Sequence, residues 1–210
     1  MLERGPLRYK EKQELKQIEK IRLDGNKKLD LALLILGKKE ATQLGSYDII
    51  GPESHKKKLQ KEFGSEFETI KKVLDKIGLL YYTEGVKEDR GILGFSFLIT
   101  RNNRSLKKIR KAVAKKDDKT FGLMMGYPET AVNTYRTEEA LDIDKDLSEG
   151  ERKQLEDENL LPFVGFKPSK SHWKEELEYV KHIQTLIKER SPKLYRQMIE
   201  DYKKESESTL

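Results

Sequence analysis

The stretch 79-LLYYTEGVKEDRGILGFSFLIT-100 carries the only strong strand signal in the chain. Its two ends, 79–83 and 92–100, are rich in the aromatic and β-branched residues that favour strands. The polar residues 84–91 between them can turn the chain back, so the stretch predicts a β-hairpin. Because an isolated hairpin is only marginally stable in water, it must pack on helices or pair with a further strand.

Helical patterns surround this hairpin on both sides. Apolar residues recur at intervals of three and four in five segments, which are predicted helices: 8–23, 29–44, 53–63, 65–77 and 106–116. Gly37 is a possible break in the second of them, and Gly45-Ser46 and Gly51-Pro52 mark a loop after it. Gly78 is a natural stop for the fourth, because glycine accepts the left-handed conformation at a helix end. Ser105 is the predicted cap of the fifth, in which Leu106, Ile109 and Val113 form the expected buried stripe.

The C-terminal region predicts two helices in succession. The first would begin after Ser171, with Trp173 on the same apolar face as Leu177 and Val180. Ser191-Pro192 combines a capping residue with a proline suited to the first helical position, so a second helix is expected to about residue 204. Trp173 is expected either to pack against this second helix in the core or to lie at an interface with a partner, and not to belong to a cofactor site.

These patterns predict a predominantly helical α+β protein with a small β-hairpin packed on helices. The expected core is residues 1–168, with the hairpin at about 79–100. Residues 169–204 would form a C-terminal helical hairpin that packs on the same domain.

The composition excludes several classes of protein. The chain has 210 residues and no cysteine, so a disulfide framework, a thiolate nucleophile and a cysteine-containing zinc site are excluded. The longest nearly apolar run, 92–99, is much shorter than the roughly 20 residues of a membrane-spanning helix. Residues 1–4 lack the apolar stretch of a signal peptide. We therefore expect a cytoplasmic protein that has no membrane partner.

The charge is distributed unevenly along the chain. The formal net charge is +6, from 43 Lys and Arg against 37 Asp and Glu. Residues 1–120 hold 29 basic and 18 acidic side chains, a net of +11, and the remainder holds 14 basic and 19 acidic, a net of −5. The first part of the chain is therefore the one in which an anion-binding surface is expected.

The densest basic cluster is at 101–119. Lys107, Arg110 and Lys111 lie away from the apolar stripe of the predicted helix, so several cations would face outward and bind phosphates. The candidate nucleic-acid or anion-binding residues are Arg101, Arg104, Lys107, Lys108, Arg110, Lys111 and Lys115. The possible partners are nucleic acid and an acidic protein.

Two other interpretations of this cluster stay open. It is a solvated helix face, as most charge runs are, or it is covered by residues 137–159, which hold ten acidic and three basic side chains.

Separately, residues 29–100 follow the element order of a winged helix, in which 65–77 would be the recognition helix with Lys71, Lys72 and Lys76 available to DNA.

The sequence carries no catalytic signature. There is no Gly-x-Ser-x-Gly motif, no Walker loop and no glycine-rich dinucleotide turn. His55, His172 and His182 lack the spacing of a helical metal site, so each is expected to be a surface or packing residue. We predict no catalytic residues, no metal site and no cofactor.

The segment FGLMMGYPETAV (121–132) resembles the Gly-Tyr-Pro segment of a bacterial protein family of unknown function. The segment LGKKEA (36–41) is faintly similar to an earlier part of the same family. This resemblance covers about a tenth of the chain, and because the family has no assigned activity, it implies no functional residue. Gly126 is expected to make a tight turn, with Pro128 opening a helix.

Three functions remain as hypotheses. The leading one is a non-enzymatic binding module whose basic surface engages nucleic acid or another polyanion. The second is a protein-protein interaction module that binds through the aromatic C-terminal helical hairpin. The third is an enzyme with an unrecognised active site.

Overall fold

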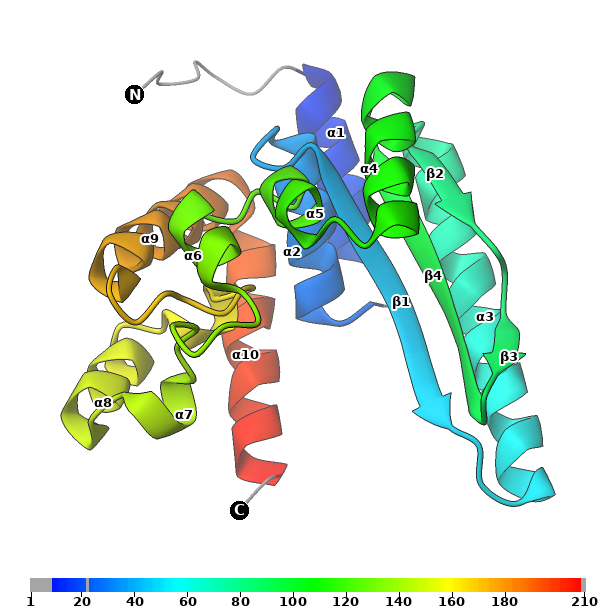
Figure 1. The fold of residues 1–210 in the computed structure, drawn as a ribbon. Helices are drawn as coiled ribbons and strands as arrows, with labels where there is room; N and C mark the ends of the chain where they lie inside the picture. The colour runs from blue at the N-terminus through cyan, green and yellow to red at the C-terminus, as the bar shows by residue number, and fades with distance from the viewer. Residues whose placement is uncertain (1–8, 22, 209–210) are drawn as a thin grey trace.

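The computed structural model describes residues 9–21 and 23–208, and the predicted α+β class is confirmed. The described residues form ten helices around a small antiparallel sheet of four strands, and 62% of the protein is helical (Figure 1). Arg8 and Arg22, at the ends of the first predicted helix, and residues 1–4 lie outside the described residues.

The predicted hairpin forms the centre of the sheet. Strand β4 (Ile92–Thr100) is central and pairs with β2 (Leu80–Thr83) on one side and β1 (Ala41–Ile49) on the other. Strand β3 (Lys87–Asp89) pairs with the beginning of β4. The further strand that the hairpin needed is therefore β1, which pairs with β4 along its whole length.

The prediction that a helix continues from 29 to 44 is wrong. Helix α2 (Gly25–Ile35) ends at Leu36, and Gly37 follows with φ 64°, where a helix cannot continue. Residues 41–44, predicted as helix, and 45–46, predicted as loop, are both part of β1. Their conformation is set by pairing with residues 49 to 59 positions later, which no local pattern reveals.

One long helix covers one face of the sheet, where two short helices were predicted. Helix α3 (Glu53–Ile77) runs without a break through Gly64 and ends at Gly78, which has φ 71° as expected of a helix stop. The ring of Phe67, in this helix, stacks on the ring of Phe97 in β4, and the two ring centroids are 4.8 Å apart. This continuous apolar stripe outweighs the roughly 1 kcal/mol that a glycine costs inside a helix. A continuous α3 has no helix-turn-helix, so the winged-helix interpretation is wrong.

Two helices cover one end of the opposite face. Helix α4 (Asn103–Lys115) and α5 (Asp118–Met124) bury Ile109 and Met124 against Leu98 of the sheet. The cap of α4 is Asn102, which accepts a hydrogen bond from the Ser105 backbone, so the prediction of Ser105 as the cap is wrong. The expected buried stripe is also shifted, because the fully buried residues are Ile109 and Ala112, whereas Val113 is 46% exposed.

The remaining helices pack beside the sheet layer. In chain order they are α1 (Tyr9–Lys20), α6 (Glu129–Thr134), α7 (Ile143–Asp146), α8 (Glu149–Asp157), a 3₁₀ turn (Leu161–Phe163), α9 (Trp173–Arg190) and α10 (Pro192–Ser208). One core cluster contains Leu31 of α2, Phe97 of β4 and Met198 of α10. The C-terminal helical hairpin thus packs on α2, beside the sheet (Figure 1).

Trp173 does not occupy the core position that its register suggested. It is the first residue of α9 and is partly exposed, with the Lys174 ammonium 5.4 Å from its ring centroid. The core of the hairpin is instead formed by residues further along, such as Val180 and Ile187 against Leu194.

The described helices are too short or too polar to span a bilayer. This agrees with the sequence, in which the longest apolar run is a strand.

Candidate functional site

Helix α4 lies at the surface of the molecule (Figure 1), and its lysines and arginines are exposed. Arg104, Lys108, Lys111 and Lys115 are separated by four, three and four residues, which places them on one side of an α-helix, and Lys107 lies beside them. All five are exposed, and we call them the α4 stripe. The opposite side of the helix holds the buried Ser105, Ile109 and Ala112.

The seven residues proposed from the sequence do not all have the same surroundings. Arg101 is exposed but engaged within the protein, because its guanidinium donates a hydrogen bond to the Ile35 carbonyl oxygen and lies 3.5 Å from the Glu14 carboxylate. Lys108 lies 3.8 Å from Glu40, a pair in which both side chains are more than half exposed. Such a pair contributes little, and it leaves Lys108 accessible to another anion.

Three members of the α4 stripe have no carboxylate partner among the described residues: Arg104, Lys107 and Lys111. Lys115 forms no ion pair within 4 Å there, but it acts electrostatically on Asp117. Arg110 is exposed and lies beside the stripe. Its guanidinium carbon is 4.0 Å from the ring centroid of Tyr82, so the side chain is held over that ring.

The acidic segment 137–159 does not neutralise the stripe. Its ion pairs within the described chain are formed with Lys145, Arg152, Lys170 and Lys181. Helices α7 and α8, which contain most of the segment, lie on the far side of the molecule from α4 (Figure 1). The cations of α4 therefore face solvent.

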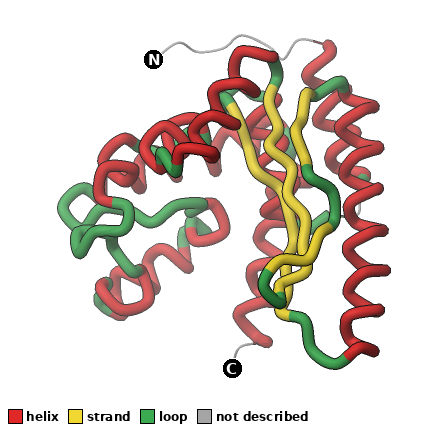
Figure 2. The backbone as a smooth tube through the Cα atoms, turned by 45° about the vertical axis from the view of Figure 1, so that its right-hand side comes forward, coloured by secondary structure: helices red, strands yellow, loops and turns green. Residues whose placement is uncertain are grey.

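An open part of the sheet continues from α4. Helix α4 covers only one end of this face, and none of the helices in the described part of the chain lies over the other end (Figure 2). Tyr47 of β1 is 82% exposed there and lies opposite Gly94 of β4. We call the residues of this side that line a hollow of about 430 Å³ the open sheet face: the exposed Gln43 and Tyr47, the half-buried Tyr82, Gly94 and Ser96, and the buried Leu98.

A second hollow of about 400 Å³ lies where α4 meets the edge of the sheet. It is lined on the helix side by Lys107, Arg110 and Lys111, and on the strand side by Tyr82 and Glu84. The hydrogen bond from Lys87, followed by the one from Tyr82, holds the pKa of Glu84 below its usual value. Glu84 is thus ionised at neutral pH, and its charge is balanced by Lys87.

Sequence reasoning found the α4 cations and missed the open sheet face. Tyr47 belongs to β1, which had been predicted as helix and loop. The alternation of exposed Gln43, buried Leu44 and exposed Tyr47 is a partial strand signal, but it is short and includes Gly45, which is uncommon within strands.

The histidines lie at the surface, as predicted for surface or packing residues. His182 Nε2 is 3.0 Å from the Lys38 ammonium, and His172 Nδ1 is 3.3 Å from the Glu175 carboxylate. No group of three or more histidines and carboxylates in the described residues is arranged to hold a metal ion.

The aromatic residues of the C-terminal helical hairpin are engaged within the protein. Tyr195 stacks on Phe163 at 5.7 Å, and the Tyr179 hydroxyl donates to the Gly126 carbonyl oxygen. None of the large apolar side chains that are exposed in the described structure belongs to α9 or α10. The hairpin therefore offers less free aromatic surface than the sheet does.

Comparison with known proteins gives no relative, since no family model, no curated protein and no solved structure matches this chain. The likeness of residues 121–132 to a Gly-Tyr-Pro segment stays a prediction. The functional conclusion rests on the geometry of α4 and of the open sheet face.

Proposed function

We propose that this protein binds single-stranded nucleic acid across the α4 stripe and the open sheet face. The observation that carries the proposal is the set of cations on α4 that have no carboxylate partner in the described structure. Phosphate groups are the partners that such an array attracts most strongly, because each contact releases condensed counterions from the nucleic acid. The backbone of the strand would follow the stripe from Arg104 to Lys115.

The aromatic side chains favour a single strand over a duplex. Tyr47 presents its ring to solvent on the open sheet face, and Tyr82 lies in the hollow beside Arg110. Unpaired bases stack on exposed aromatic rings and on arginine planes, whereas the bases of a duplex are stacked on one another. Room for a base beside Tyr47 is provided by the hollow of about 430 Å³ that the open sheet face lines.

The test compares two triple variants of the same charge. Lys107→Ala, Lys108→Ala and Lys111→Ala remove three cations from α4, and Lys57→Ala, Lys58→Ala and Lys61→Ala remove three exposed cations from α3. Binding to mixed-sequence single-stranded RNA and DNA is measured by fluorescence anisotropy over a series of salt concentrations. A plot of the logarithm of the affinity against the logarithm of the salt concentration has a negative slope. The magnitude of this slope should fall by about 2 in the α4 variant and stay unchanged in the α3 variant.

Further measurements separate single strands from other polyanions. Tyr47→Ala should weaken single-strand binding by about fivefold to 150-fold, the range of one base stacked on an aromatic ring. A duplex and an acidic polypeptide serve as competitors, and either one binding more tightly than the single strand would overturn the choice of ligand. Undetectable binding at about 50 mM salt, or equal losses in the α3 and α4 variants, would overturn the proposal as a whole.

A further inference from the structure

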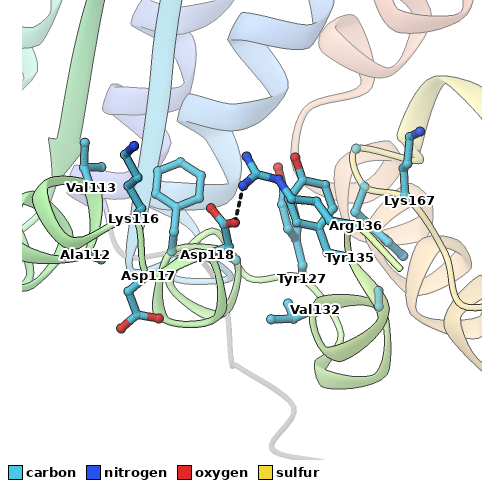
Figure 3. Close-up of a pocket in the computed structure, with 15 residues that line it drawn as sticks. Ala112, Val113, Lys116, Asp117, Asp118, Tyr127, Val132, Tyr135, Arg136 and Lys167 are labelled. Carbon is cyan, nitrogen blue, oxygen red and sulfur yellow. Dashed lines mark ion pairs between the residues drawn. The ribbon is translucent and has the colours of Figure 1, made fainter. Parts of the chain in front are cut away.

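A larger pocket opens next to α4, outside the surface described above. Its volume is about 850 Å³, within the 300 to 1,000 Å³ usual for small-molecule sites. It is bounded by the end of α4, by α5, by α6 and by residues 165–167 (Figure 3). The walls therefore come from two segments that are distant in sequence, as is common for ligand sites between structural units.

Aromatic rings line this pocket from three of its walls. Phe121 comes from α5, Tyr127 and Tyr135 flank α6, and Phe166 comes from the segment before α9. Phe166 and Tyr127 are 5.8 Å apart between ring centroids, which fixes the two rings against each other. Tyr135 is 47% exposed, so part of this aromatic surface is available to a ligand.

An ion pair crosses the pocket between its walls. The Arg136 guanidinium, following α6, lies 2.8 Å from the Asp118 carboxylate at the start of α5, and Figure 3 shows it reaching toward that carboxylate. Both side chains are largely exposed, so water screens the pair and it contributes little to stability. A phosphate can therefore replace Asp118 as the partner of Arg136, whose planar guanidinium suits two phosphate oxygens.

Two further cations line the pocket and form no ion pair within 4 Å in the described structure, and one of them, Lys167, also acts electrostatically on Asp142. Lys116 and Lys167 lie on either side of the Arg136–Asp118 pair in the view of Figure 3. The remaining carboxylate, Asp117, already caps α5 by accepting a hydrogen bond from the Thr120 backbone. The charge left uncompensated in the pocket is positive.

The backbone at two of these cations is held in an uncommon conformation. Lys116 has φ 56° and Arg136 has φ 64°, in the left-handed region that residues other than glycine seldom adopt. Such positions gather at ligand-binding sites, where the surrounding structure holds them. Here they set the directions of two cations on opposite walls of one pocket.

We infer that this pocket binds a nucleotide, with the base among the aromatic rings and the phosphate near Lys116, Arg136 and Lys167. Two sources share this chemistry: a free nucleoside monophosphate, and the 5′-phosphorylated end of a strand. The second source rests on the proposed function. It has a structural basis in Val113, which lines this pocket as well as both hollows of the nucleic-acid surface.

The first test uses free ligands and the full-length protein. The four nucleoside 5′-monophosphates and the corresponding nucleosides are titrated by calorimetry. Lys116→Gln with Lys167→Gln should weaken nucleotide binding at least tenfold, whereas Lys119→Gln with Lys153→Gln, two exposed lysines outside the pocket, should leave it unchanged. Nucleosides that bind as tightly as the phosphorylated compounds would overturn the role given to the cations.

The second test blocks the pocket without disturbing the core. Gly165 lines the pocket, is exposed, and has no atom within 4 Å of an added Cβ. Gly165→Trp should therefore fill the opening and abolish nucleotide binding, and Gly165→Ala should bind as the native protein does. The same pair of variants is measured with 5′-phosphorylated and 5′-hydroxyl oligonucleotides.

The outcomes distinguish the two sources and separate this inference from the proposed function. If a mononucleotide binds the native protein and does not bind Gly165→Trp, the ligand is a free nucleotide. This conclusion does not depend on how the α4 variant binds nucleic acid. Binding of only the 5′-phosphorylated strand, weakened by Gly165→Trp, supports the strand end. If no mononucleotide binds at about 1 mM and Gly165→Trp leaves oligonucleotide affinity unchanged, the inference is overturned while the proposed function still stands.

Discussion

The hydroxyl of Tyr179 donates a hydrogen bond of 2.7 Å to the carbonyl oxygen of Gly126. The bond joins α9 to the turn that precedes α6, two segments separated by 53 residues. The Tyr179 ring also contacts the edge of Phe166, so one side chain holds two walls of the 850 Å³ pocket. The C-terminal helical hairpin thus contacts the pocket walls through Tyr179.

Tyr179→Phe should lower the free energy of unfolding by about 1 kcal/mol, because it removes one hydrogen bond and keeps the ring. Urea denaturation followed by circular dichroism measures the difference. Tyr135→Phe is the matched control, since the exposed Tyr135 hydroxyl forms no hydrogen bond to a described residue. Equal stability of the two variants would show that the Tyr179 bond contributes nothing.

Gly126→Ala should destabilise the protein by about 2 to 4 kcal/mol, because two costs act together. Gly126 has φ 77°, and an added Cβ would lie 2.5 Å from the Lys38 carbonyl oxygen. Gly150→Ala is the control: Gly150 lies in α8 and nothing is within 4 Å of its added Cβ. That variant should be neutral or more stable by up to about 1 kcal/mol. A tolerated Gly126→Ala would contradict the tight turn.

Thr42→Val should leave stability unchanged or raise it by about 1 kcal/mol. The Thr42 hydroxyl is fully buried and has no hydrogen-bond partner in the described structure, so its desolvation is uncompensated. Thr100→Val, on the neighbouring strand, should destabilise by about 1 kcal/mol, since the equally buried Thr100 hydroxyl donates to the Asn102 carbonyl oxygen at 3.1 Å. Thermal denaturation of the two valine variants gives opposite shifts if this is correct.

The free energy of unfolding should decrease above pH 10, and ionisation of Tyr127 should account for part of this decrease. Burial raises the pKa of Tyr127 to about 12, against about 10 in the unfolded chain. Between these values the unfolded state loses the phenolic proton and the folded state keeps it, so rising pH favours unfolding, by about 2 kcal/mol at pH 12. Tyr127→Phe should lack this part of the pH dependence, which denaturation of both proteins at a series of pH values measures. Parallel curves would contradict the burial of Tyr127.

The same pKa matters for the proposed nucleotide pocket. At neutral pH Tyr127 carries no charge, so its ring and hydroxyl do not repel a phosphate held by Lys116 or Arg136. Nucleotide affinity should therefore be insensitive to pH between about 7 and 9, which lies well below the folded pKa.

Local patterns were sufficient for most of the elements. The strand at 92–100 has the predicted bounds, and the turn at Gly78 ends its helix as expected. The failures share one cause. Strand β1 forms because it pairs with β4, and α3 continues through Gly64 because Phe63 and Phe67 both pack on the same strand. These contacts connect residues far apart in the chain and outweigh local preference.

The candidate site shows the same division. The cations of α4 follow from their spacing alone, because a helix repeats every 3.6 residues and the apolar positions orient it. The contacts of Arg101 do not follow from spacing, since its partners Ile35 and Glu14 belong to other helices.

By itself the sequence determined the helical content, the central strand and the basic helix, since short-range periodicity and charge spacing act within a few residues of the chain. The tertiary structure alone decided that α4 leaves part of the sheet open beside Tyr47, and that the acidic segment lies away from α4. It also decided that Arg136 meets Asp118 across a pocket. Each of these depends on how whole elements pack, and packing is set by the sum of many distant contacts.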